Sequence, residues 1–195
     1  ILEGAVYLPE IDLWLDPPKK KPFAFVSHAH ADHLASHETA ICSFETQKLA
    51  KTRCKIKNYA PKPFLSPFLI KDYELTLYPA GHILGSAMLL IRKNGQSLLF
   101  SGDFKLRESF TSEKIVIPKA DLLIMESTFG KPHFVFPDKQ TIQQKVNELI
   151  EAYETPVFFT YTLGKSQEIL SHIQDTQKRI YCDIRIRTMN QIYET

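Results

Sequence analysis

The stretch VSHAHADHLASHE, residues 26–38, gathers three histidines and an aspartate within six positions: His28, His30, Asp32 and His33. Neutral imidazole nitrogens and carboxylate oxygens are ligands that zinc and related divalent cations prefer. An HxHxDH run presents alternate side chains to two adjacent points from one loop. We therefore predict that His28 and His30 face one ion, and that Asp32 and His33 face a second. The alternative is a polar loop whose imidazoles are merely solvated.

A two-ion site needs more ligands than this loop supplies, and two later residues qualify. His82 in PAGHILGS follows an apolar run and stands beside two glycines, and Asp103 in FSGDF closes the next apolar run. A carboxylate there could bridge two cations about 3.5–4 Å apart, as two-metal hydrolytic sites require. Alone, each would be interpreted as a structural histidine or a turn aspartate, but together they favour a metal site. The remaining histidines, His37, His133 and His172, are predicted to be surface residues.

These ligands need strand and helix ends to carry them, and the hydrophobic patterns predict such elements. Helices are expected from Asp32 onward and at 45–53, 138–154 and 164–176, with a last one after residue 183; in the third of these, Ile142, Val146, Ile150 and Tyr153 would share a buried face. Strands are expected at 4–9, 11–16, 23–28, 39–44, 73–82, 120–128 (buried), 156–161 and 179–183, and residues 60–68 are expected to be connecting chain. A hairpin is expected at 86–103, with its turn at Asn94-Gly95, a favoured type I′ pair. Strands come in pairs early and alternate with helices later, which predicts a layered α/β fold with mixed sheets.

Composition narrows the class of protein. The chain has 195 residues, 44% of them hydrophobic, enough to bury a core in one domain or one and part of another. No apolar run approaches the ~20 residues of a membrane span. Three scattered cysteines without a CxxC motif predict buried or idle thiols in a reducing, cytoplasmic setting. The net charge of +2 carries no global nucleic-acid signature, and the short basic runs at 17–22 and 51–57 are typical of solvated surfaces. The first residue is not methionine, so we expect a trimmed N-terminus.

Four motifs taken in order, SHAHADH, PAGHILGSA, SGDF and ESTFG, resemble successive signatures of the metallo-β-lactamase superfamily in its β-CASP nuclease branch. The histidine loop is shared across the superfamily, whereas the other three together are typical of nucleic-acid processors. Within the branch the chain is similar to ligase-associated DNA exonucleases, also described as mRNA 3′-end processing factor-like proteins. GAVYLPEIDLWLDP, ESTFGKP and YTLGKSQEIL carry this likeness along essentially the whole chain.

The resemblance implies an αββα four-layer sandwich with two divalent ions, zinc or manganese. It places His28, His30 and His82 on one ion and Asp32 and His33 on the other, with Asp103 bridging them. It also implies catalytic roles for Asp32, which would orient the attacking water, and for Glu126 of ESTFG, which would orient a histidine near the scissile phosphate. Lys105 and Lys165, with Arg107, could neutralise flanking phosphates, although each could equally be a solvated surface charge. The start of the helix at residues 163–168 could also receive a phosphate, or be an ordinary connection.

The chain also departs from the family pattern, because family members continue into an SDHAD-like segment with further histidines. We therefore expect an N-terminal fragment, with residues 1–155 forming most of the metallo-β-lactamase domain and residues 156–195 starting a β-CASP domain. The function expected is a metal-dependent nuclease, foremost a DNA exonuclease in repair with a functional link to a DNA ligase and no membrane association. The alternatives are an RNA-processing β-CASP ribonuclease, a small-molecule metallo-hydrolase of the thioesterase or lactamase type, and a non-catalytic scaffold. As an isolated fragment the chain is expected to be inactive.

Overall fold

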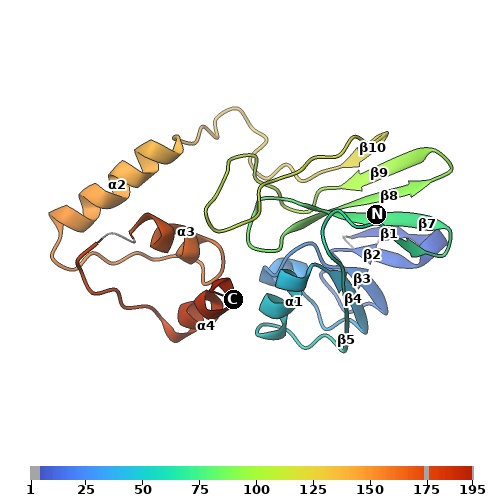
Figure 1. The fold of residues 1–195 in the computed structure, drawn as a ribbon, viewed down its shortest axis with the longest axis horizontal. Helices are drawn as coiled ribbons and strands as arrows, with labels where there is room; N and C mark the ends of the chain where they lie inside the picture. The colour runs from blue at the N-terminus through green and yellow to red at the C-terminus, as the bar shows by residue number, and fades with distance from the viewer. Residues whose placement is uncertain (1–4, 174–175, 195) are drawn as a thin grey trace. The chain divides into compact units, whose positions relative to one another are not determined.

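The computed structural model describes residues 5–173 and 176–194, and these residues divide into two compact units. The first unit spans Ile1–Glu126 and the second Ser127–Thr195. Each unit is coloured along the chain in Figure 1. Within the described ranges, no helix is both long and apolar enough to cross a membrane.

The first unit contains two five-stranded sheets. One sheet has the order β1-β2-β3-β4-β5, in which β1 and β2 are antiparallel and the remaining neighbours are parallel. Its strands are β1 Val6–Leu8, β2 Leu13–Leu15, β3 Phe23–Phe25, β4 Thr39–Cys42 and β5 Asn58–Pro61, with a short 3₁₀ turn Pro9–Ile11 between the first two. The helix α1, Phe44–Lys51, begins directly after β4, where the Ser43 side chain accepts a hydrogen bond from the amide of Thr46 as an N-cap.

The second sheet has the order β10-β9-β8-β7-β6, antiparallel except for the parallel pair β9 and β10. Its strands are β6 Phe68–Ile70, β7 Tyr73–Pro79, β8 Ala87–Lys93, β9 Gln96–Phe100 and β10 Leu122–Ile124. The predicted hairpin between β8 and β9 is confirmed, because Asn94 and Gly95 both have positive φ angles, 50° and 76°, as a type I′ turn requires.

The two sheets pack face to face, since one buried cluster draws on both of them (Figure 1). Its fully or nearly fully buried members are Leu13, Leu15, Phe25 and Ile41 from the first sheet, Ile11 from the 3₁₀ turn that precedes β2, and Leu75, Leu77, Ala87, Leu89 and Ile91 from the second sheet. Because side chains alternate along a strand, the neighbouring residues Val26, Ala40 and Cys42 form a separate cluster on the opposite face of the first sheet. The outer face of the second sheet is covered by Phe104, Ile115 and Ala120 from an irregular segment, not by a helix of the first unit.

Several local predictions in the first unit were wrong. No helix begins at Asp32; the chain makes one 3₁₀ turn, Ala31–His33, and then continues without regular secondary structure to residue 38. The Pro-rich segment 60–68 contributes residues to β5 and β6 at its two ends. The strand predicted at 120–128 forms only as β10, and Leu122 and Leu123 are 56% and 52% exposed because β10 is an edge strand. Residue 4 of the first predicted strand lies outside the described residues.

The second unit contains three helices among its described residues: α2 Lys139–Ala152, α3 Lys165–His172 and α4 Ile184–Tyr193. Val146 and Ile150 of the predicted amphipathic face are buried and Ile142 packs beside them, but Tyr153 is 59% exposed because α2 ends before it. The strands predicted at 156–161 and 179–183 do not form, and Phe159 is 97% exposed. The predicted helix 164–176 is shorter than expected, and its residues 174 and 175 lie outside the described ones.

The predicted fold class, α/β with mixed sheets, is confirmed. Compactness divides the chain after Glu126, so α2 belongs to the second unit although the sequence boundary put it in the first domain. The assignment of 1–155 and 156–195 to a metallo-β-lactamase domain and a β-CASP domain remains a prediction.

Candidate metal centre

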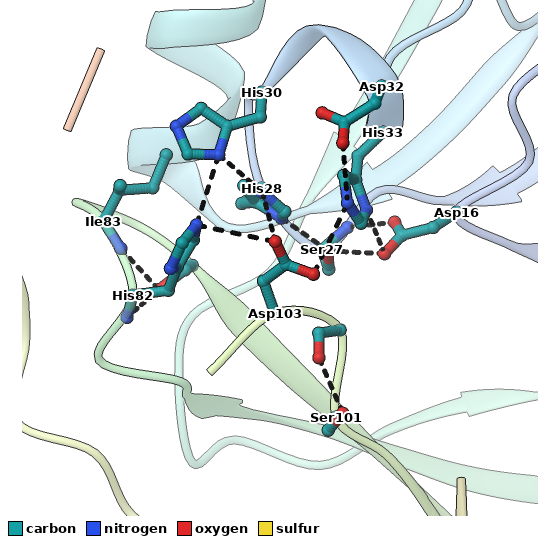
Figure 2. A network of polar contacts seen from close by, with 12 residues as sticks. Asp16, Ser27, His28, His30, Asp32, His33, His82, Ile83, Ser101 and Asp103 are labelled. Atoms are coloured by element: carbon teal, nitrogen blue, oxygen red, sulfur yellow. Dashed lines mark hydrogen bonds and ion pairs between the residues drawn. The ribbon is translucent and has the colours of Figure 1, made fainter. Parts of the chain in front are cut away.

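Three loops of the first unit, each following a strand, bring the predicted ligands together (Figure 2). His28 and His30 follow β3, His82 follows β7, and Asp103 follows β9. One ligand atom from each of these four residues lies within 4.8 Å of the other three, although 75 positions separate the first from the last. The arrangement is therefore the meeting point that the metal hypothesis required.

The distances in this group fit a small divalent cation. A tetrahedral ion with ligand bonds of ~2.0–2.2 Å separates its ligand atoms by about 3.3–3.6 Å. His30 Nδ1 lies 3.0 Å from His28 Nε2 and 3.2 Å from His82 Nε2. Asp103 Oδ2 lies 3.8 Å from His28 Nε2 and 3.7 Å from His82 Nε2. Three imidazole nitrogens and one carboxylate oxygen thus converge at the spacing of one coordination shell.

The second carboxylate oxygen of Asp103 faces a different histidine. Asp103 Oδ1 lies 3.5 Å from His33 Nε2, and Asp32 Oδ2 lies 3.8 Å from the same nitrogen. Figure 2 shows the Asp103 carboxylate between the His28–His82 side and the His33 side of the cluster. One carboxylate therefore has one oxygen at each of two adjacent ligand groups, which is the geometry of a bridging ligand.

The surroundings of the histidines favour a metal ion over protons on the first side of the cluster. Burial and the neighbouring histidines lower the pKa of His28 well below its usual value and lower that of His82 to about 4. Burial also raises the pKa of Asp103, and the charge of Glu126 adds to this increase while that of His33 opposes it. At neutral pH the rings of His28 and His82 are therefore neutral, and each has one nitrogen whose lone pair is available to a cation.

His33 differs from the other histidines. Burial lowers its pKa, but the hydrogen bond with Asp16 and the charges of Asp16, Asp103 and Asp32 outweigh that effect and raise the pKa to about 9. A cation at this side must therefore displace a proton from His33 at neutral pH.

Two residues that support the ligands were missed by the sequence analysis. Asp16, at the end of β2, accepts hydrogen bonds through Oδ1 from the Ser27 amide (2.7 Å) and through Oδ2 from the Ser27 hydroxyl (2.5 Å). The same Oδ2 lies 2.9 Å from His33 Nδ1, and Ser27 Oγ lies 2.9 Å from His28 Nδ1. These contacts fix the ring orientations and leave the Nε2 atoms of both histidines facing the cluster.

Asp16 also lies within ligand distance of His28 and His33, but its oxygens already accept the Ser27 and His33 hydrogen bonds. We therefore assign it an orienting position rather than a ligand position. The available signal was that Asp16 closes the apolar run IDLWLD just as Asp103 closes its own run.

The other predicted site residues occupy different surroundings. The Asp32 side chain is 80% exposed at the edge of the cluster. Glu126 follows β10, its amide donates to Ser101 Oγ (3.2 Å), and its charge affects the pKa values of Asp103 and His82. Lys105 is partly buried, and its charge helps lower the pKa of His82. Lys165 belongs to the second unit, where it forms an ion pair with Glu168. The catalytic and substrate-binding roles of these four residues remain predictions.

Two of the three remaining histidines were wrongly predicted to be surface residues. His37 is completely buried, and its Nδ1 accepts a hydrogen bond from the amide of Lys21 (3.2 Å), which ties two loops together. His172 is 8% exposed and packs against Gln143 of α2. His133 is exposed as predicted.

No family model matches the chain, but its sequence is similar to those of several known proteins. A protein of Opitutus terrae named probable DNA ligase is 39% identical over 199 residues, which cover 97% of this chain and 19% of that protein. Probable RNase MJ4 of Methanocaldococcus jannaschii is 26% identical, covering 77% of this chain and 44% of its own length. Human DNA cross-link repair 1A protein is 28% identical, covering 75% of this chain and 16% of its own length. These relatives are β-CASP metallo-β-lactamase proteins.

The chain belongs to the β-CASP branch of the metallo-β-lactamase superfamily. It spans less than half the length of each of these relatives. A protein of unknown function from Enterococcus faecalis has the same fold, with a TM-score of 0.65 and 14% identity over 88% of this chain and 49% of that one. The His/Asp cluster of this β-CASP chain stands where the SHAHADH, PAGHILGSA and SGDF motifs meet, and it could hold a metal ion.

Proposed function

We propose that this chain carries the metal-binding part of a metal-dependent nuclease that hydrolyses phosphodiester bonds, and that its substrate is DNA. The ions are two divalent cations, with zinc preferred because the donors are imidazole nitrogens and carboxylate oxygens. Manganese is the alternative.

The observation that carries the proposal is the position of Asp103, with Oδ2 facing His28 and His82 and Oδ1 facing His33. A single carboxylate shared by two adjacent ligand groups is what a two-metal hydrolase requires. Divalent cations in such a pair make water a nucleophile at neutral pH and polarise phosphoryl oxygens.

The remaining residues have supporting roles in this proposal. Asp16 and Ser27 hold the tautomers of His33 and His28, so that both Nε2 atoms are available to cations. Asp32 is exposed at the edge of the cluster, where it would bind the cation on the His33 side. It would also accept a hydrogen bond from the attacking water and so orient that water. Glu126 orients a proton donor at the scissile phosphate, and Lys105 and Lys165 neutralise flanking phosphates.

DNA is preferred over RNA because a relative whose name is probable DNA ligase aligns with 97% of this chain at 39% identity. The same alignment supports a functional link to DNA ligation in repair. The RNA-processing alternative is supported by the alignment with probable RNase MJ4 over 77% of the chain. A cytoplasmic location is supported by free thiols at all three cysteines, Cys42, Cys54 and Cys182.

The experiment compares the wild-type chain with Asp103→Asn, which keeps the size of the side chain and removes its charge. Zinc binding by the chain should fall from two ions to one or none, and cleavage of labelled DNA by the intact protein should be abolished, because both ligand groups lose a donor. The control is Glu151→Gln, an exposed carboxylate of the second unit, which should behave as wild type. Near wild-type cleavage by Asp103→Asn would end the two-metal proposal, and parallel assays on single-stranded DNA, duplex DNA and RNA identify the substrate.

A further inference from the structure

The loop of residues 80–86, which carries His82, is closed on itself by hydrogen bonds. Ser86 Oγ accepts from the amides of His82 (3.0 Å) and Ile83 (3.2 Å). The Ser86 amide donates to the Ile83 carbonyl (3.0 Å), and the Ala80 amide donates to the Ser86 carbonyl (2.8 Å). The loop therefore behaves as one small rigid body, and the position of His82 depends on how that body is fastened to its surroundings.

One side of this loop is fastened to the start of α1 through Gly85. The Gly85 carbonyl accepts hydrogen bonds from the hydroxyls of Ser43 (2.7 Å) and Thr46 (2.8 Å). Gly85 has a φ of +77°, and a Cβ there would lie 2.6 Å from the Thr46 amide nitrogen. No other residue type would fit between the loop and the helix without displacing one of them.

The amide of Gly85 is held by a carboxylate that the ligand pattern does not contain. Both oxygens of Glu113 accept the Gly85 amide hydrogen, at 2.9 and 3.1 Å. Ser112 Oγ, next to it, donates to the Gly81 carbonyl (3.0 Å), and the Lys105 amide donates to the Ala80 carbonyl (3.0 Å). Glu113 is partly buried, so its carboxylate loses part of its solvation. The hydrogen bonds that it accepts from Gly85 offset this cost.

We propose that Glu113 is a positioning residue for the metal centre: it clamps Gly85 and thereby holds His82 at coordination distance from His30 and Asp103. The proposal rests on the metal centre described under the proposed function and adds a residue to it. Without the clamp, the loop keeps its attachment to α1 but loses the contact that ties Gly85 to residues 105–116. His82 Nε2, 3.2 Å from His30 Nδ1, would then no longer be held in place before a cation arrives.

The experiment follows Gly85 and zinc binding in the same chain. The variants are Glu113→Ala, which removes the clamp, and Glu113→Gln, whose carboxamide oxygen can still accept the Gly85 amide. The control is Glu108→Ala, an exposed glutamate of the same segment that is paired with Lys114. Hydrogen exchange of the Gly85 amide is measured by NMR, zinc affinity by competition with a chelator, and the geometry of the site by the visible absorption of bound cobalt.

In Glu113→Ala the Gly85 amide should exchange at least about tenfold faster, while the amide of Leu89 in β8 keeps its protection. Zinc affinity at the three-histidine side should fall by about ten- to a hundredfold, as is usual when a group that orients a ligand is lost, and the cobalt absorption should change. Glu113→Gln should recover most of both losses, and Glu108→Ala should match the wild type.

A Glu113→Ala chain whose zinc affinity stays within about twofold of wild type would overturn the proposal, whatever its Gly85 exchange rate. An unchanged Gly85 exchange rate would overturn it as well, because the clamp would then not be formed in solution. If Glu113→Ala fails to fold, Glu113→Gln decides: a wild-type cobalt spectrum and affinity in that variant support the clamp, and a loss of zinc affinity of about tenfold or more in it would refute the clamp. Zinc binding without nucleic-acid cleavage by the intact protein would refute the nuclease assignment but not the role of Glu113.

Discussion

Replacement of Gly102 by alanine should disrupt the first unit at the point where the metal centre is anchored. Gly102 has a φ of +51°, and a Cβ there would lie 2.6 Å from the Cβ of Ser27 and 2.7 Å from its Oγ. Ser27 is 1% exposed and cannot retreat without losing its hydrogen bonds to Asp16 and His28. The substitution therefore imposes a backbone strain and a steric overlap at once.

The size of the effect follows from these two terms. A left-handed backbone costs a residue with a Cβ roughly 1–2 kcal/mol. Forcing an extra methyl group into a packed site costs a further 1–3 kcal/mol or so. Gly102→Ala should thus lower the free energy of unfolding by about 2–5 kcal/mol. The matched control is Gly95, which has a φ of +76° and nothing within 4 Å of the position of a Cβ. Gly95→Ala should lower the free energy of unfolding only by the backbone cost of roughly 1–2 kcal/mol.

Urea unfolding of the metal-free chain, followed by fluorescence, measures both variants. The single tryptophan, Trp14, lies in β2, so the signal reports the first unit. In a Ser27→Gly background the overlapping atoms are gone, so adding Gly102→Ala there should lower the free energy of unfolding only by the cost of the left-handed backbone. If Gly102→Ala were no less stable than Gly95→Ala, the packing of Ser27 against Gly102 would not be as described.

Two further predictions concern protons. The pKa of His33 is raised to about 9, while those of His28 and His82 are lowered by burial. Zinc uptake at pH 7.5 should therefore release a proton from the His33 side only, and zinc affinity on that side should rise with pH up to about 9. Calorimetry in buffers of different ionisation enthalpy measures the release, and zinc binding without it would contradict the described environment of His33. Burial lowers the pKa of His37, so this histidine takes up a proton at higher pH in the unfolded chain than in the folded chain. The stability that neutral His37 contributes is therefore complete above about pH 6.5 and is lost as the pH falls below that value. His37→Gln, which keeps an acceptor for the Lys21 amide but does not titrate, should flatten the acid side of the stability curve measured in a chelator, and an identical pH dependence in the two chains would show that His37 is not buried neutral.

The fold of the first unit could be predicted in outline because its strands carry local signals. The apolar runs before His28, His82 and Asp103 and the Asn94-Gly95 turn each depend on nearby residues alone. The strands predicted at 156–161 and 179–183 failed because β propensity needs a partner strand, and none pairs with them among the described residues. The helix expected from Asp32 failed for a different reason, since His33 and His37 form hydrogen bonds with residues that lie far from them in the sequence, Asp16 and Lys21.

The residues that could bind metal were predictable from the pattern of side chains alone, because imidazole and carboxylate groups at fixed spacing after strands have few other uses. How these side chains are held depends on contacts between distant parts of the chain. Asp16 and His33 are 17 positions apart, and Glu113 and Gly85 are 28 apart, so no local pattern links either pair. The hydrogen bond that His37 accepts likewise comes from Lys21, 16 positions earlier. Ligand identity is a property of side-chain chemistry, whereas ligand orientation depends on which loops the packed sheets bring side by side.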